Sequence, residues 1–210
     1  MEQVNITYCG HACFLLEADG YRIVLDPYRD GMVPGLPDLN LKAEAVYCSH
    51  GHDDHGFVQA VTILDTDKSM PYTLDEFVTP HDDQGGKLRG MNTVRIFNFD
   101  GLRISHLGDI GCYPEDDLLN KLKHVDCLMI PVGGFYTIDA ATAKNIVDAV
   151  QPRVTIPMHY RTDNSGFDRI AHISDFTQYY PRVKSCDNTV TLTQNTENQI
   201  LVINYKPQGD

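Results

Sequence analysis

Residues 49–56 read SHGHDDHG, which places three histidines and two aspartates in six consecutive positions of a chain that has only nine histidines. An apolar core does not explain this stretch, because a buried polar group without a partner costs on the order of 2–7 kcal/mol. A solvated loop could hold the same residues, but it would need no particular spacing. His50 and His52 lie two apart at the end of a strand-like run, so both side chains project from the same side. That spacing favours two imidazoles that share one metal ion.

A second metal ion would need further ligands from elsewhere in the chain. Asp54 and His55 follow where the strand should break, so they can turn toward a second ion. Three more candidates stand where a predicted strand ends in a loop: His81 in TPHDDQGG, Asp109 in SHLGDIG and His159 in TIPMHY. Imidazole nitrogens and carboxylate oxygens, at about 2.0–2.2 Å, are the usual zinc ligands, and Mn²⁺ or Fe²⁺ also accept mixed sets. Four strand ends converging on one edge would form a binuclear centre.

Several of these residues have alternative roles. A structural zinc site is one alternative, although such sites usually prefer cysteine. His106 competes with His81 as a ligand, but it shares one side of a strand with Ile104, where a histidine more often packs or hydrogen-bonds, so we favour His81. His11 in CGHACF either lines the site or packs. Asp26 in IVLDPY is expected behind the ligands, because metal-bound histidines usually donate their other ring N–H to such a carboxylate.

Length, charge and composition bound the class of protein. The 210 residues fit one domain with a sizeable core, spanning 1–210. The net charge of −12 argues against an extended nucleic-acid surface or an anionic-membrane surface, since either would need a basic face. No signal peptide or apolar run of membrane length is visible, and the six scattered cysteines fit buried thiols. We therefore expect a cytoplasmic protein.

The chain pattern predicts strands first and then alternating helices and strands. The expected strands, which alternate or run apolar, are 3–9, 12–19, 21–28, 45–49, 93–99, 102–107, 127–134, 153–160, 189–193 and 200–205. The expected helices are 114–125, 139–150 and 169–180. The stretch between the histidine cluster and residue 92 is expected to be rich in loops. This order suggests sheets covered by helices in one domain.

The motifs together resemble a known family. HGHDDH at residues 50–55 matches the HxHxDH signature of the metallo-β-lactamase superfamily, and Asp26 matches its first motif. The spacing of His81, Asp109 and His159 matches its later motifs. HDDQGGKLRGMNT, HLGDIG and PVGGFYTIDAATA most resemble the branch of simple bacterial metal-dependent hydrolases that includes the ascorbate-6-phosphate lactonases. The resemblance covers nearly the whole chain and implies an α/β fold, the αββα four-layer sandwich, with metals at one edge.

Carried over to this chain, the resemblance implies two divalent metal ions, Zn²⁺ or else Mn²⁺ or Fe²⁺, and divides seven ligands between them. The first metal would be held by His50, His52 and His81, the second by Asp54, His55 and His159, with Asp109 bridging the two. A flavodiiron-like redox protein would carry glutamate in place of His52, so oxygen chemistry is disfavoured.

The predicted reaction is hydrolysis by a hydroxide, because two cations lower the pKa of a shared water toward ~7. Asp54 would orient the hydroxide and later pass its proton to the leaving group. Arg89, just past His81, could bind a phosphate or carboxylate of the substrate, and Tyr136 could stabilise the developing oxyanion. A solvated loop is the alternative for Arg89.

The substrate expected first is a small, anionic ester or lactone. A phosphodiesterase acting on a small diester is the alternative, because the same binuclear site serves both reactions. A non-hydrolytic metal-binding or redox protein is a distant third. The expected partner is a small molecule, with no membrane and no extended nucleic-acid surface, and a homo-oligomer stays an open alternative.

Overall fold

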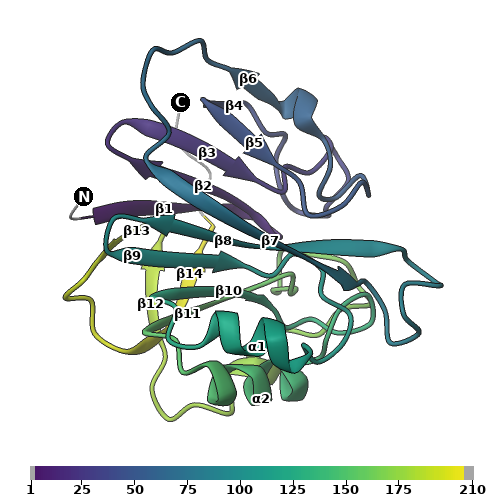
Figure 1. Cartoon of the computed structure of the whole chain (residues 1–210). Helices are drawn as coiled ribbons and strands as arrows, with labels where there is room; N and C mark the ends of the chain where they lie inside the picture. Colours follow the sequence, from purple (N-terminus) through teal and green to yellow (C-terminus); the bar gives the residue numbers. More distant parts are fainter. Residues whose placement is uncertain (1–2, 206–210) are drawn as a thin grey trace.

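Two β-sheets packed face to face form the centre of the molecule in the computed structural model, which describes residues 3–205 (Figure 1). The first sheet has the strand order β13-β1-β2-β3-β5. Its strands are β1 (Gln3–Gly10), β2 (Cys13–Ala18), β3 (Tyr21–Leu25), β5 (Ala45–Tyr47) and β13 (Thr189–Thr193). The second sheet has the order β12-β14-β11-β10-β9-β8-β7. Its strands are β7 (Tyr72–Pro80), β8 (Met91–Phe99), β9 (Leu102–His106), β10 (Cys127–Pro131), β11 (Val154–Met158), β12 (Lys184–Asp187) and β14 (Gln199–Asn204).

The largest apolar core lies between the two sheets. In β1, Val4, Ile6 and Tyr8 are buried while the residues between them are only partly covered, as the alternation of a strand requires. Phe97 of β8 and Ile156 of β11 belong to the same buried cluster from the opposite sheet. The apolar alternation used to predict these strands is therefore the feature that joins the sheets.

Three α-helices of the described residues pack against the outer face of the seven-stranded sheet. They are α1 (Asp116–Leu122), α2 (Ala140–Val150) and α3 (Ser174–Thr177). Helix α2 begins where the Asp139 carboxylate accepts the N–H of Thr142 at 2.8 Å, an N-cap that satisfies a free donor. Its buried face packs in one cluster with Leu118 and Leu122 of α1. Figure 1 shows α1 and α2 below the sheet that they cover.

The outer face of the five-stranded sheet is covered without an α-helix in the described part of the chain. It is covered by the loop of residues 27–40, the paired strands β4 (Leu41–Ala43) and β6 (Val61–Ile63), and the 3₁₀ turn η1 (Val58–Ala60). Prolines and glycines in MVPGLP prevent helix formation there. The predicted α/β sandwich is confirmed, with this outer layer built of loop and strand.

Two secondary-structure predictions are wrong. Residues 169–180 contain only the four-residue helix α3, because the preceding backbone bonds to distant segments instead of to itself. The Ala171 N–H donates to the Gly133 carbonyl at 2.7 Å, and the Ala171 carbonyl accepts from Arg161 at 3.0 Å. Residues 72–80, in the stretch expected to be rich in loops, form the edge strand β7. Strands β4, β6 and β12 have no counterpart in the predicted strands.

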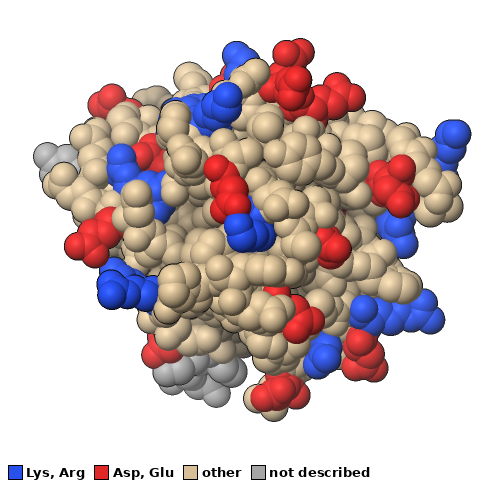
Figure 2. All heavy atoms as spheres, turned by 90° about the horizontal axis from the view of Figure 1, so that it is seen from below, with Lys and Arg blue, Asp and Glu red and all other residues tan. Residues whose placement is uncertain are grey.

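The surface over the helical layer carries charges of both signs. Figure 2 shows this face, on which lysine and arginine are interspersed with aspartate and glutamate. Within residues 3–205, no helix has the length and apolar character needed to cross a bilayer. The predictions about nucleic acid, membranes, location and domain number stay predictions.

Candidate metal centre

Loops that follow four strands meet at one edge of the sandwich. Residues 49–55 follow β5, His81 follows β7, Asp109 comes three residues after β9, and His159 follows β11. Strands β9 and β11 both run parallel to β10, so their C-terminal ends lie on the same edge of the sheet. Gly108 turns the chain toward the site with a φ of +54°, and a Cβ there would overlap Ser49. The convergence is therefore a consequence of strand direction and local turns.

His50, His52 and His81 form one group of potential ligands. Their ligand atoms all lie within 4.8 Å of one another. The ring centre of His50 lies 4.5 Å from that of His52 and 4.5 Å from that of His81. The structure thus brings together the three histidines that the resemblance assigns to one metal.

Asp54, His55 and His159 form a second group, and His11 joins them. The ligand atoms of these four residues also lie within 4.8 Å of one another. Asp54 and His55 come from the loop after β5, whereas His159 adopts a left-handed backbone, with φ +54°, directly after β11. Such a conformation is uncommon in residues other than glycine and directs the side chain inward here.

Asp109 lies between the two groups. Its Oδ1 is 3.2 Å from His55 Nε2, and its Oδ2 is 3.2 Å from His159 Nε2. The same Oδ2 is 3.5 Å from Nε2 of His81, which belongs to the other group. A single carboxylate is thus in reach of both groups, the position expected of a bridging ligand.

The residues fit divalent cations because their inward-facing atoms lack other partners. His50 Nε2, His55 Nε2, His159 Nε2 and Asp109 Oδ1 are buried without a well-formed hydrogen bond from any described residue, although His55 Nε2 and His159 Nε2 each lie 3.2 Å from an Asp109 oxygen. Buried side-chain nitrogen and oxygen atoms are normally hydrogen-bonded, so four unpaired ones that converge need an explanation. A cation at each group supplies one, since imidazole and carboxylate are ligands that Zn²⁺, Mn²⁺ and Fe²⁺ accept.

The charge states of the ligands also fit cation binding. Burial lowers the pKa of His50 to about 3, and nearby His55 adds to the effect, so the His50 imidazole is neutral near pH 7. Burial likewise lowers the pKa of His81. For Asp109, burial opposes ionisation, but His159 and His55 outweigh it and hold the pKa well below its ordinary value. Neutral His50 and His81 beside an ionised Asp109 are the protonation states that bind metal. His55 differs: burial opposes its charge, but Asp109 and Asp26 outweigh burial and raise its pKa well above the ordinary value, so a bound cation would have to displace that proton.

Asp26 lies behind the second group, where the sequence predicted it. Its Oδ2 accepts from His55 Nδ1 at 2.8 Å and from the Ser49 hydroxyl at 2.6 Å, and its Oδ1 accepts the Ser49 N–H at 2.6 Å. The carboxylate is almost fully buried. Because Nδ1 of His55 donates to Asp26, Nε2 is the nitrogen left to face the site.

Asp26→Asn should weaken metal binding by about 10–100-fold, the range typical of losing a carboxylate that orients a ligating histidine. The amide keeps the shape but loses charge and one acceptor toward His55. Competition with a chromogenic zinc chelator measures the change. Asp126→Asn is a matched control, because Asp126 is also buried but lies at the other end of β10. There it forms an ion pair with the Arg153 guanidinium and accepts the backbone N–H of Arg103. Equal metal affinity in both variants would contradict the orienting role.

The structure separates the two histidines that had competing roles. His106 is not in either group, since its Nε2 donates to the Ala12 carbonyl at 3.0 Å and its Nδ1 accepts from Gly108 N–H at 3.2 Å. His11 lies in the second group, with Nε2 3.3 Å from Asp54 Oδ2. Of the two roles that the sequence left open for His11, the structure therefore supports the one at the site.

A pocket of about 390 Å³ opens over the ligands, and both predicted substrate residues line it. The Arg89 guanidinium lies 5.7 Å from the centre of the Tyr136 ring, as in a cation–π contact. The Tyr136 ring centre lies 6.4 Å from that of His159. Met32 and Phe167 add apolar surface to the same pocket.

The loop that carries Arg89 is fixed by Asp82, a residue that the sequence analysis did not single out. The Asp82 carboxylate is buried and accepts four backbone N–H groups at 2.8–2.9 Å, those of Gln84, Gly86, Leu88 and Arg89. The backbone at Arg89 is therefore held directly beside the ligand His81.

Comparisons with known proteins agree with this geometry. A family model described as beta-lactamase superfamily domain matches residues 5–159. A protein of Archaeoglobus fulgidus named UPF0173 metal-dependent hydrolase is 28% identical over 197 residues, which cover 76% of this chain and 84% of that protein. A UPF0173 protein of Pyrococcus furiosus is 30% identical over 184 residues, with 76% and 84% covered.

A solved structure from Thermotoga maritima gives the same result at the level of fold. That protein, described as a candidate zinc-dependent hydrolase of the metallo-beta-lactamase superfamily, superimposes with a TM-score of 0.75 at 30% identity. The match covers 97% of this chain and 100% of that chain.

Proposed function

Because this chain belongs to the metallo-beta-lactamase superfamily and is a metal-dependent hydrolase, we propose that it uses two bound cations to hydrolyse a small, anionic ester or lactone. The observation that carries the proposal is Asp109, whose two oxygens lie within 3.5 Å of histidines from both ligand groups. One carboxylate shared by two histidine groups fits two cations better than one.

Seven side chains would hold the two cations, with Zn²⁺ the first choice and Mn²⁺ or Fe²⁺ the alternatives. They are His50, His52 and His81 at the first position, Asp54, His55 and His159 at the second, and Asp109 at both. When bound, such cations lower the pKa of a water toward ~7 and polarise the bond that breaks. Proton transfer, substrate binding and stabilisation of the oxyanion would be carried out by the chain's own residues.

We assign the proton transfer to Asp54. Burial opposes ionisation of its carboxyl, but the hydrogen bond from His11 and the charge of His55 outweigh burial and hold the pKa below its ordinary value. The carboxylate is thus ionised at neutral pH and borders the 390 Å³ pocket. It can accept a proton from the attacking water and deliver it to the leaving oxygen.

Arg89 and Tyr136 support an anionic substrate. Both line the pocket over the ligands, and the Tyr136 ring packs against the guanidinium of Arg89. A guanidinium can bind a phosphate or carboxylate through two parallel hydrogen bonds. The Tyr136 hydroxyl can donate to the oxyanion that develops as the ester is attacked.

Arg89→Lys should raise KM for an anionic substrate by about 5–50-fold, because the ammonium keeps the charge but loses the fork geometry and the stacking on Tyr136. KM for a neutral analogue should change by less than about three-fold. Both constants come from initial rates with the same metal-loaded preparation, and metal content serves as the control. Equal changes for the two substrates would remove Arg89 from anion binding.

A phosphodiesterase is the second candidate function, since a site that holds two cations also suits in-line displacement at phosphorus. The discriminating experiment is a panel of lactones, carboxylic esters and small phosphodiesters, assayed with protein reconstituted with Zn²⁺ or Mn²⁺. Turnover of lactones or esters at least ten-fold above that of diesters supports the first proposal. The reverse ratio favours the second, and no turnover in any class contradicts both.

A further inference from the structure

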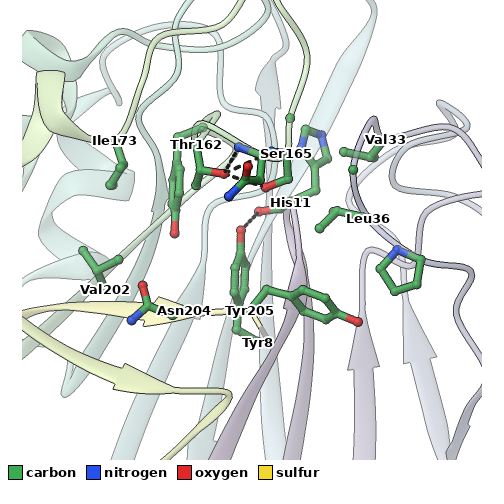
Figure 3. A pocket seen from close by; sticks show the side chains of 15 residues that line it. Tyr8, His11, Val33, Leu36, Thr162, Ser165, Ile173, Val202, Asn204 and Tyr205 are labelled. Carbon is green, nitrogen blue, oxygen red and sulfur yellow. Dashed lines mark hydrogen bonds between the residues drawn. The ribbon is translucent and has the colours of Figure 1, made fainter. Parts of the chain in front are cut away.

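His11 stands at the tip of the β1–β2 hairpin in a backbone conformation that needs support. Its φ is +56°, a left-handed value that is uncommon outside glycine and is often found at functional sites. Two hydrogen bonds to its carbonyl hold it there. The His159 N–H donates at 2.9 Å, and the Tyr8 hydroxyl donates at 3.1 Å (Figure 3). The hairpin tip is thereby fixed to the end of β11, beside the second ligand group.

The His11 side chain lies between two spaces. On one side it contacts Asp54, which borders the pocket over the ligands. It also lines a separate cavity of about 630 Å³, shown in Figure 3, which Tyr8, Tyr160 and Leu36 help to form. The ring is fully buried, lies 4.0 Å from the His159 ring centre and meets the edge of Phe167 at 5.3 Å. Contacts with Asp54, His159 and Phe167 hold the ring on the side that faces the ligands.

The hydrogen on the His11 ring can be assigned from its contacts. Nε2 lies 3.3 Å from Asp54 Oδ2, and a carboxylate oxygen without a hydrogen can only accept. Nε2 therefore carries the hydrogen, because the other tautomer would place a nitrogen lone pair against the carboxylate. Nδ1 has no partner among the described residues, so nothing competes for this choice.

We propose that His11 is a positioning residue for Asp54: its Nε2–H donates to Oδ2 and fixes the rotation of the carboxylate about the Cβ–Cγ bond. The inference rests on the proposed function, in which Asp54 transfers the proton. A carboxylate that both contacts a cation and moves a proton must be held at one angle, and a misplacement of about 1 Å can cost on the order of 10²-fold in rate. His55 Nε2, 3.6 Å from the same oxygen, is too far to do this alone.

The competing role is that of an additional metal ligand, since the ligand atom of His11 lies within 4.8 Å of those of Asp54, His55 and His159. The two roles predict different losses. A positioning residue affects turnover while the metal stays bound, whereas a ligand affects metal binding first. Metal affinity measured beside turnover therefore separates them.

Methionine and glutamine make a matched pair at position 11. Both are unbranched and of similar length, so they bear the same backbone strain at positive φ and keep the wall to the 630 Å³ cavity filled. Only glutamine has an amide N–H that can replace the Nε2 donor. His11→Met removes the hydrogen bond and His11→Gln restores it.

With Zn²⁺-loaded protein, His11→Met should lower kcat about 10–100-fold and leave KM and zinc affinity within about three-fold. His11→Gln should recover most of the loss in kcat. Unchanged kcat in His11→Met, or an equal fall in both variants with metal retained, overturns the proposal. Loss of one zinc per chain in both variants identifies His11 as a ligand and also overturns it.

A second measurement does not depend on turnover. It can therefore test the role of His11 even if the proposed hydrolysis is wrong. In Co²⁺-loaded protein, the visible absorption bands report the geometry around the metal. A band shift in His11→Met that is absent in His11→Gln, at equal Co²⁺ stoichiometry, supports positioning even if the wild-type chain hydrolyses none of the tested substrates. Identical spectra in the wild type and both variants overturn it.

Discussion

Asp54→Asn should lower kcat by at least ~10², the range typical of losing a general acid–base group. The amide keeps the size of the side chain but neither ionises nor accepts a proton at neutral pH. It also turns a ligand oxygen into a poorer donor to the cation, so metal affinity should fall, by less than the loss in turnover. Initial rates at saturating Zn²⁺, corrected for bound metal, isolate the effect on the chemical step.

Asp53→Asn is the matched control for this measurement. Asp53 precedes Asp54 in the same loop and also lines the pocket, but it is in neither ligand group, and its half-exposed carboxylate pairs with Arg29 at 2.9 Å. An exposed ion pair of this kind contributes little to stability, on the order of 0–1 kcal/mol. Asp53→Asn should therefore keep kcat within about two-fold of the wild type. Near-normal turnover by Asp54→Asn with normal metal content would remove Asp54 from the mechanism.

Most of the ligand cluster could be predicted from the sequence, because most ligands stand in a recognisable local sequence context. His50 and His52 lie two apart in the loop just after β5, and Asp109 and His159 each follow an apolar strand, whereas His81 follows β7, which the sequence did not predict. Strand ends on one edge meet by topology, so convergence follows once the strands run as predicted. The division into two groups came from the family resemblance, and the ligand roles stay predictions until metal is bound.

His11 and Asp82 show what such local reasoning could not supply. The place of His11 depends on a backbone hydrogen bond from His159, a residue 148 positions away in the chain, which no local pattern reports. Asp82 depends on four backbone N–H groups that point inward only after the loop has closed. Both are polar residues whose role is set by tertiary geometry, so the sequence left His11 open between packing and lining the site and did not single out Asp82.

The fold errors have the same origin. Strand β7 is an edge strand whose Asp75, Glu76 and Val78 are exposed, so it lacks the apolar alternation of a buried strand. Segment 169–180 has helical spacing, but its first residues bond to Gly133 and Arg161 instead. Pairing with a distant strand or loop outweighs a weak local propensity, which amounts to less than about 1 kcal/mol per residue.

Removing bound metal should abolish hydrolysis and destabilise the fold. Without cations, the inward-facing Nε2 atoms of His50, His55 and His159 have no hydrogen-bond partner among the described residues. A ligand present at about 100 times its dissociation constant stabilises a protein by about 2.7 kcal/mol. For a chain of this size that corresponds to a fall in Tm of roughly 5–10 °C on chelation, measurable by scanning calorimetry.

Titrating Zn²⁺ back into the chelated protein tests whether the centre is binuclear. If each ligand group holds one ion, activity should keep rising until about two equivalents of Zn²⁺ per chain are bound. In Asp109→Asn, activity should stop rising at fewer than two equivalents of Zn²⁺ per chain. The reason is that this side chain lies within 3.5 Å of His55, His81 and His159 and serves both positions. Full activity and full recovery of Tm at one equivalent in the wild type would contradict the binuclear proposal, and would leave the second group to a role without metal.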